Sequence, residues 1–295
     1  MLPTPLFFLF LVLLLCDEPQ AVYALTPTES SYTADRRLAQ SNVRVAKAEK
    51  TTSASQTPIG PDPLSDETRA IEAISGSRVP GTIEHLLTRP ARKGHGEHMV
   101  INILYPSIGR SDVDSDIRQW VTAIADSFER AFDRDRLLAE IGGQREALND
   151  PIELLADYSI SRPSQKALSI TFELWNHVGG PHPNLDVITL NYSLINGQRL
   201  SLADIFALPD VALKLMSKVA RADLQERYGT GRTHMLYRGT EPLIENFSSL
   251  TLTPTGISVN FQPYQVASWE MGVQKVDITL EDLAQARPLT ALWGK

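Results

Sequence analysis

The stretch LSITFELWNHVGGPHPNLDVITLNYSL, residues 168–194, decides the fold because both of its halves alternate apolar and polar side chains. An alternation of period two is typical of a β-strand with one buried face. The positions that share the apolar face are Leu168, Ile170, Phe172 and Leu174 in the first half, and Ile188, Leu190, Tyr192 and Leu194 in the second. The stretch therefore predicts a half-buried antiparallel pair of strands with one face packed on helices.

Helical patterns flank this pair on both sides. Before it, Ser111 and Asp114 read as a helix start, followed by apolar residues at a spacing of three to four. After it, residues 209–228 read as a longer helix that ends at Gly229. Strands and helices are mixed without a regular βαβ alternation. We therefore expect an α+β fold, with a mostly antiparallel sheet and helices on one face, in a single domain built of two sub-parts.

The N-terminal region reads as a leader followed by a linker. Residues 6–16 form an apolar run of the length of a signal-peptide core, and small residues precede a cleavage site after Ala24. Residues 25–80 are rich in Ser, Thr, Ala, Gln and Pro and predict a disordered linker. We expect a signal peptide over residues 1–24 and an exported protein, periplasmic or at the cell surface. An uncleaved leader would instead anchor the chain in the membrane, and lipidation of Cys16 is a third alternative.

Composition and charge exclude several classes of function for this protein. The chain has 295 residues, of which 42% are hydrophobic and 21% charged, as in ordinary globular proteins. A formal net charge of −7 argues against nucleic acid as a partner. Cys16 is the only cysteine, so removal of the leader leaves no disulfide, no cysteine nucleophile and no cysteine-bound zinc.

The turn WNHVGGPHP, residues 175–183, allows three interpretations: a metal or catalytic site, a recognition loop, or a tight turn only. His177 and His182 could bind a metal ion together with Glu173 or Asp186, but no third ligand has a convincing spacing. Gly179 and Gly180 fit a turn that needs positive φ angles, and prolines stiffen its tip. No nucleophile elbow or phosphate-binding loop is visible elsewhere. We therefore predict no catalytic residues, no metal ligands and no cofactor.

A second unusual segment is PYQVASWEMG, residues 263–272. Its large side chains Tyr264 and Trp269 stand among turn-forming residues. That composition suits an exposed contact surface. The competing interpretation is that both aromatic side chains fill the end of a sheet as core residues.

The motifs of these segments, in this order, resemble an extracytoplasmic domain family of unknown function. It is shared by the lysozyme-sensing anti-sigma factor RsiV and the N-terminal part of the peptidoglycan deacetylase PdaC. The resemblance spans roughly residues 83–283. Its sharpest pieces are Gly179-Gly180-Pro181-His182, then Asn196-Gly197 with Leu200, Leu202, Asp204 and Phe206, and finally Pro263-Tyr264 with Gly272. Pro183 departs from the family, which usually has glycine there, so the loop is stiffer and lacks one backbone N–H donor.

The resemblance implies a PdaC-like half over residues 81–175 and an RsiV-like half over residues 176–288. It also implies a non-enzymatic envelope domain that binds or senses peptidoglycan fragments or a peptidoglycan-acting protein such as lysozyme. The alternative is a small metal-dependent envelope hydrolase or deacetylase-like enzyme that uses the His177 and His182 region. The predicted binding residues are Trp175, His177, Gly179, Gly180, His182, Tyr264 and Trp269.

Overall fold

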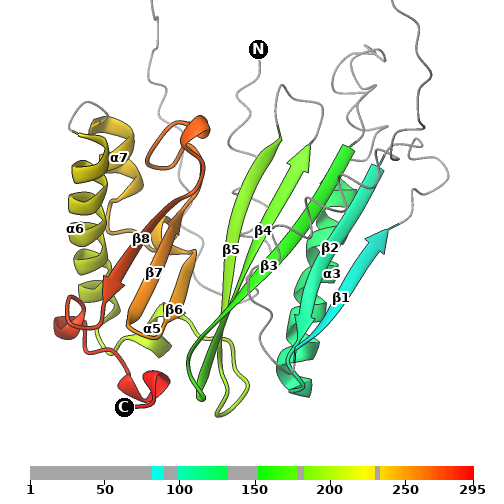
Figure 1. Cartoon of the computed structure of the whole chain (residues 1–295), viewed down its shortest axis with the longest axis horizontal. Helices are drawn as coiled ribbons and strands as arrows, with labels where there is room; N and C mark the ends of the chain where they lie inside the picture. Colours follow the sequence, from blue (N-terminus) through cyan, green and yellow to red (C-terminus); the bar gives the residue numbers. More distant parts are fainter. Residues whose placement is uncertain (1–81, 90–98, 132–151, 178–182, 230–232) are drawn as a thin grey trace, which may run out of the picture. The chain divides into compact units, whose positions relative to one another are not determined.

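The computed structural model describes residues 82–89, 99–131, 152–177, 183–229 and 233–295, which all belong to one compact unit, Ala70–Lys295. The predicted leader and linker lie outside these residues. Two sheets with few helices form the unit, so the predicted α+β class is confirmed (Figure 1). No helix in the ranges given above is both long and apolar enough to cross a membrane.

The first sheet has five strands in the order β1-β2-β3-β4-β5. Their bounds are Ile83–Arg89, Met99–Ser107, Ile152–Ser164, Ala167–His177 and Asn184–Ser193. All neighbours pair antiparallel except β2 and β3, which run parallel. The predicted pair of strands is β4 and β5, in the register that sets Phe172 opposite Ile188.

Helix α3, Ser111–Ala131, covers one face of this sheet (Figure 1). The predicted stripe packs inward, with Val113, Ile117, Val121, Ile124 and Phe128 buried. Trp120 joins them, with its ring centroid 4.8 Å from that of Phe172 on β4. The helix begins at Ser111, as the sequence predicted. Asp114 accepts a hydrogen bond from the Ile108 N–H at 2.7 Å and so ties the helix to the end of β2.

The second sheet has three antiparallel strands, β6 (Leu250–Thr253), β7 (Gly256–Phe261) and β8 (Gln274–Thr279). The helices around it are α5 (Leu202–Ile205), α6 (Pro209–Tyr228) and α7 (Thr233–Gly239), with 3₁₀ turns η3 (Ile244–Phe247), η4 (Trp269–Met271), η5 (Ala284–Ala286) and η6 (Thr290–Trp293). Helix α6 has the predicted bounds and ends where Gly229 adopts a φ of 69°.

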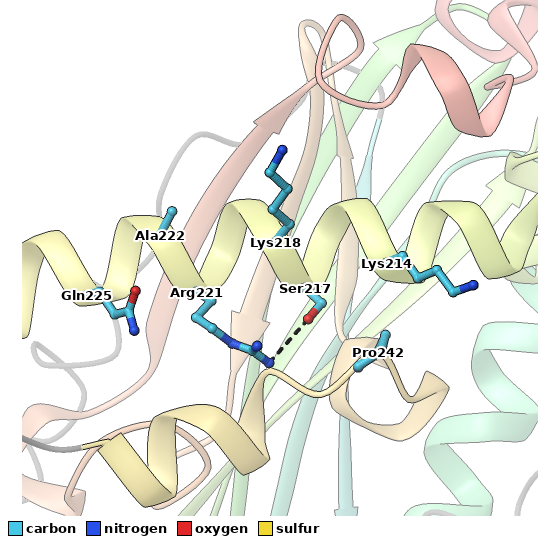
Figure 2. Close-up of a pocket in the computed structure, with 7 residues that line it drawn as sticks. All are labelled: Lys214, Ser217, Lys218, Arg221, Ala222, Gln225 and Pro242. Atoms are coloured by element: carbon cyan, nitrogen blue, oxygen red, sulfur yellow. Dashed lines mark hydrogen bonds between the residues drawn. The ribbon is translucent and has the colours of Figure 1, made fainter. Parts of the chain in front are cut away.

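Arg221 ties α6 to α7. Its Nε atom donates to Thr240 Oγ1 at 3.0 Å, and its guanidinium lies 4.7 Å from the centroid of the Tyr237 ring. Ser217, one turn earlier on α6, donates to the Thr240 carbonyl at 2.5 Å. These bonds fix the chain that follows α7 alongside α6 (Figure 2).

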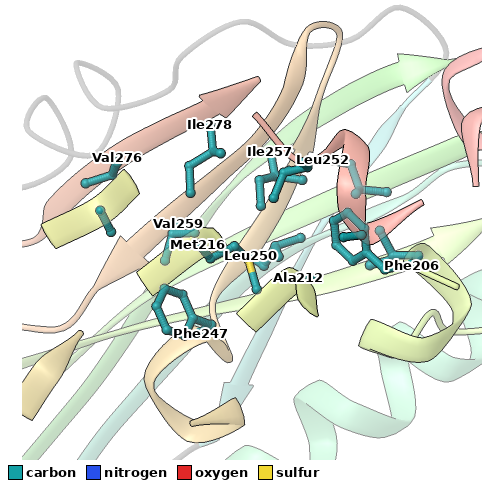
Figure 3. Close-up of a cluster of buried hydrophobic side chains, with 14 of the residues drawn as sticks. Phe206, Ala212, Met216, Phe247, Leu250, Leu252, Ile257, Val259, Val276 and Ile278 are labelled. Atoms are coloured by element: carbon teal, nitrogen blue, oxygen red, sulfur yellow. The ribbon is translucent and has the colours of Figure 1, made fainter. Parts of the chain in front are cut away.

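The core of the second sub-part lies between α6 and the three-stranded sheet (Figure 3). Strand register forms two apolar rows across the sheet, Leu252–Ile257–Ile278 and Leu250–Val259–Val276. Ala212, Met216, Ala220 and Leu224 recur on α6 at a helical spacing and are fully buried in the same cluster. Burial of these side chains stabilises the second sub-part.

The two sub-parts are joined at a polar seam, where β6 lies against β3, β4 and β5. Ser169 Oγ accepts a hydrogen bond from the Leu252 N–H at 2.8 Å, and Asn191 donates to the Leu250 carbonyl at 2.8 Å. Side chains of the first sheet thus satisfy backbone groups on the edge of β6, which would otherwise be buried without partners.

The seam corrects one expectation about β5. The alternation predicted that Val187, Thr189 and Asn191 would face solvent, yet all three are buried. Their face is covered because β6 packs on it and binds its polar groups.

The division between the two sub-parts that was expected at residue 176 falls inside β4, and the chain leaves the first sheet only after β5.

Candidate functional site

The predicted binding residues fall on two segments, and some lie outside the described chain. Trp175 and His177 are at the end of β4, whereas Tyr264 and Trp269 lie between β7 and β8. Gly179, Gly180 and His182 are outside the described residues, so the turn itself is not placed.

The segment after β7 is hydrogen-bonded to β5, the edge strand of the first sheet. The Gln262 side chain binds both the N–H (2.8 Å) and the C=O (2.6 Å) of Val187.

Tyr264 lines an open groove of about 420 Å³, which we call the Tyr264 groove. Its wall comes from α7, the chain after α7, and the turn after β7. The lining residues are His234, Met235, Arg238, Gly239, Glu241, Leu243, Asn246, Tyr264 and Gln265.

Amide side chains hold the groove in shape. Gln265 donates to the carbonyls of Gly239 (3.0 Å) and Asn246 (2.9 Å), and its own oxygen accepts from the Gln262 N–H. Asn246 donates to the carbonyls of Arg238 and Glu241. Gly239 is required at the contact between α7 and the turn, since a Cβ atom there would lie 2.0 Å from the Gln265 carbonyl oxygen. The groove is therefore built on a hydrogen-bonded frame.

Tyr264 itself stands in a strained backbone conformation. Its φ of 67° lies in the left-handed region, which costs a side chain with a Cβ about 1–2 kcal/mol. Its side chain is nevertheless 51% exposed, so it is not the core residue of the alternative interpretation. Strain retained at an exposed aromatic residue is typical of a functional position.

The surroundings of Tyr264 are amphipathic. Met235 and Leu243 are exposed apolar side chains of the groove, and Ile244 beside it is 57% exposed. His234, Arg238 and Glu241 add donors, an acceptor and charge of both signs. Such a surface can stack on or cover an apolar face of a ligand and hydrogen-bond its rim. Sequence reasoning missed all of these residues except Tyr264 because no motif links α7 to the turn after β7.

The remaining predicted binding residues lie in two places, Trp269 in η4 and Trp175 with His177 on β4. Trp269 is half-buried in η4, next to the exposed Met271. Trp175 is 38% exposed on the side of the first sheet opposite α3, and His177 is half-buried. Strand register places Leu86, Val100 and Leu155 on the same face as Trp175. We call this the Trp175 face.

Two carboxyl groups stand directly opposite each other on the Trp175 face, Asp157 on β3 and Glu173 on β4. Burial raises the pKa of Asp157, and the charge of Glu84 adds to the shift. Burial is the larger of two causes that raise the pKa of Glu173, and repulsion from Asp157 is the smaller. Two carboxylates opposite each other repel when both are ionised, so this part of the Trp175 face favours a cationic contact.

The metal-site alternative gains no support from the described positions. Register sets Glu173 opposite Val187 and Asp186 opposite Leu174, so the two carboxylates point to opposite faces of the sheet. Asp186 instead accepts a hydrogen bond from Asn176 at 3.3 Å, and burial raises its pKa to about 6. Among the residues that the structure places, no three His, Cys, Asp or Glu side chains gather closely enough to hold a metal ion.

Comparison with known proteins agrees with the resemblance seen in the sequence. Residues 203–281 match a family described as "Protein of unknown function (DUF3298)". The chain is 31% identical over 127 residues to the peptidoglycan-N-acetylmuramic acid deacetylase PdaC of Bacillus subtilis, a match that spans 43% of this chain and 27% of that protein. The expected resemblance to PdaC is thus confirmed, while that to RsiV stays a prediction. The matched family segment contains the whole Tyr264 groove.

One solved structure shows a similar fold. A DUF3298 family member from Bacteroides fragilis aligns with a TM-score of 0.51 at 16% identity, over 72% of this chain and 95% of that one. A second DUF3298 family protein, from Pseudomonas aeruginosa, aligns with a TM-score of 0.48 at 14% identity, over 74% of this chain and 97% of that one.

Proposed function

We propose that this chain is a non-enzymatic, extracytoplasmic binding protein that recognises peptidoglycan or a peptidoglycan-acting protein such as lysozyme. The Tyr264 groove is the primary contact, and the Trp175 face is a second one. The predicted leader would deliver the protein to the periplasm or cell surface, where both ligands occur.

The observation that carries the proposal is Tyr264 itself. An aromatic side chain that is half-exposed despite a φ of 67° is held out at a groove whose frame is hydrogen-bonded on both sides. Folding alone gives no reason to keep that arrangement, because a glycine would relieve the strain. A ligand that packs on the ring does give one. Preorganised aromatic contacts lose little entropy on binding.

The ligand class is supported by two further features. PdaC, to which the chain is similar, is named for an activity on peptidoglycan, and the residues that the structure describes hold no cluster of His, Cys, Asp and Glu side chains that could bind a metal ion. The acidic pair Asp157 and Glu173 on the Trp175 face suits a basic protein surface, which favours lysozyme among the protein ligands.

The ligand class is tested by titrating the full-length chain with lysozyme and, separately, with soluble peptidoglycan fragments. We expect saturable binding to one of them, with an affinity for lysozyme that falls as salt screens the acidic face. A protein of similar charge and size without activity on peptidoglycan serves as the control for non-specific attraction. If neither ligand binds, or if the control protein binds equally well, the stated ligand class is wrong.

A further inference from the structure

A second groove, separate from the Tyr264 groove, lies on α6. It has a volume of about 380 Å³ and is lined by Lys214, Ser217, Lys218, Arg221, Ala222, Gln225 and Pro242. Helix α6 supplies all of these but Pro242, which faces the helix from the chain after α7 (Figure 2). Lys214, Lys218 and Arg221 are spaced by four and three residues, so they lie on one side of the helix. The groove therefore gathers three cations in a chain whose net charge is −7.

The three cations have no acidic partners among the residues that the structure describes. Within the described part of the chain, none of them forms an ion pair with a carboxylate, whereas the next cation on the helix, Arg227, pairs with Asp223. Lys214 and Lys218 are exposed, so their ammonium groups can turn toward a ligand in the groove. An unpaired cluster of like charges raises the local concentration of anions.

Arg221 is the fixed member of the cluster. Its Nε atom and Nη2 atom donate to Thr240 at 3.0 and 3.3 Å, and Tyr237 holds the guanidinium from one face. No acceptor among the described residues is bonded to its Nη1 atom. A guanidinium held in this way presents its remaining N–H donors without further loss of side-chain entropy, and such donors suit the oxygens of a phosphate group.

We infer that this groove binds a phosphate group, with Arg221 as the fixed donor and Lys214 and Lys218 as flexible cations. Ala222 and Pro242 add apolar atoms to the lining at two separate places, which suits a phosphate ester with a small organic carrier. The positive charge is local, because Asp210 and Glu226 are exposed on the same helix. A single phosphate group therefore fits this surface better than a flat anionic membrane.

The test titrates the full-length chain with inorganic pyrophosphate and with glycerol 3-phosphate at low salt, by calorimetry. The informative variant is Lys214→Gln with Lys218→Gln, which leaves the structural Arg221 in place. Its matched control is Lys166→Gln with Lys275→Gln, which removes the same charge at exposed lysines elsewhere. We expect binding of pyrophosphate in the millimolar range or tighter, weakened about tenfold in the Lys214 and Lys218 variant and less than twofold in the control.

The inference is overturned if neither phosphate binds the wild-type chain, or if the two double variants weaken binding equally. Vesicles of phosphatidylglycerol, with phosphatidylcholine as the neutral reference, distinguish a lipid headgroup from a soluble phosphate. Sedimentation with the anionic vesicles in the absence of pyrophosphate binding would also overturn it, because it would show a membrane surface instead of a groove. The inference is independent of the proposed function, so Tyr264→Ala should leave pyrophosphate binding unchanged.

Discussion

At the scale of single residues, Tyr264 and Trp175 show how far sequence reasoning reaches. Both were predicted from aromatic side chains in turn-rich or open-face positions, and both prove to be exposed, at 51% and 38%. The positive φ of Tyr264 could not be predicted, because nothing in the sequence around a tyrosine marks a left-handed backbone. The groove around it was also unforeseen. Its residues come from α7, the chain after it and the turn after β7, and only tertiary packing brings these together.

The strain at Tyr264 leads to the first stability prediction. Glycine adopts a φ of 67° freely, whereas alanine retains the penalty of its Cβ atom. We therefore expect Tyr264→Gly to be more stable than Tyr264→Ala by about 1 kcal/mol in chemical denaturation. Both variants should lose ligand affinity because both lack the ring. Equal stability of the two variants would show that the backbone is not strained at this position.

Asp186 makes stability depend on pH. Burial raises the pKa of this carboxyl group from 3.8 to about 6, so the folded chain holds its proton more tightly than the unfolded chain. Stability contributed by that proton is complete below about pH 4 and is lost as the pH rises toward 6. We expect Asp186→Asn to match the wild type at pH 4 and to be more stable by up to about 3 kcal/mol at pH 8, because each pKa unit corresponds to about 1.4 kcal/mol.

The measurement for Asp186 is the free energy of unfolding of both proteins at several pH values. The bond from Asn176 remains possible in the variant, since an amide oxygen can also accept it. If the difference in free energy of unfolding between Asp186→Asn and the wild type is the same at pH 4 and pH 8, the raised pKa does not belong to Asp186.

At the scale of elements, the sequence predicted the strands and helices well but not the seam between the sub-parts. Period-two alternation identified β4 and β5, and the apolar stripe identified α3, because each pattern is local. Thr189 and Asn191 looked like solvent-facing residues for the same local reason. They are buried because β6, about sixty residues later in the chain, packs on them and forms hydrogen bonds with both side chains. Polar residues on one face of a strand do not reveal whether their partner is water or a second sheet.

Removal of one oxygen atom, the Oγ of Ser169, should weaken the seam. Ser169 is fully buried and its Oγ atom accepts from the Leu252 N–H at 2.8 Å, so Ser169→Ala leaves a buried donor without a partner. We expect a loss of about 1–3 kcal/mol in the free energy of unfolding, measured by denaturant titration. The matched control is Ser159→Ala on β3, which is exposed and should change stability by less than about 0.5 kcal/mol. Equal effects of the two substitutions would mean that the seam contributes little.

At the scale of the whole molecule, two sub-parts share one fold and offer three surfaces of different chemistry. The Trp175 face belongs to the first sheet, and the Tyr264 groove and the cationic groove belong to the second sub-part. The Gln262 side chain bonds the turn that carries Tyr264 to β5, which neighbours the strand of Trp175. A ligand large enough to cover that bridge could contact Tyr264 and Trp175 together, whereas a small fragment would use the groove alone.

The most direct test of the central claim compares ligand affinity in two full-length variants, Tyr264→Ala and Ile195→Ala. Both residues are exposed, at 51% and 63%, but Ile195 follows β5 at the end remote from the Gln262 contact. With lysozyme or peptidoglycan fragments, whichever binds the wild type, we predict that Tyr264→Ala weakens binding at least about tenfold, the loss of a central aromatic contact. Ile195→Ala should remain within twofold of the wild type. Undiminished affinity of Tyr264→Ala, with both variants folded, would contradict the assignment of the Tyr264 groove as the binding site.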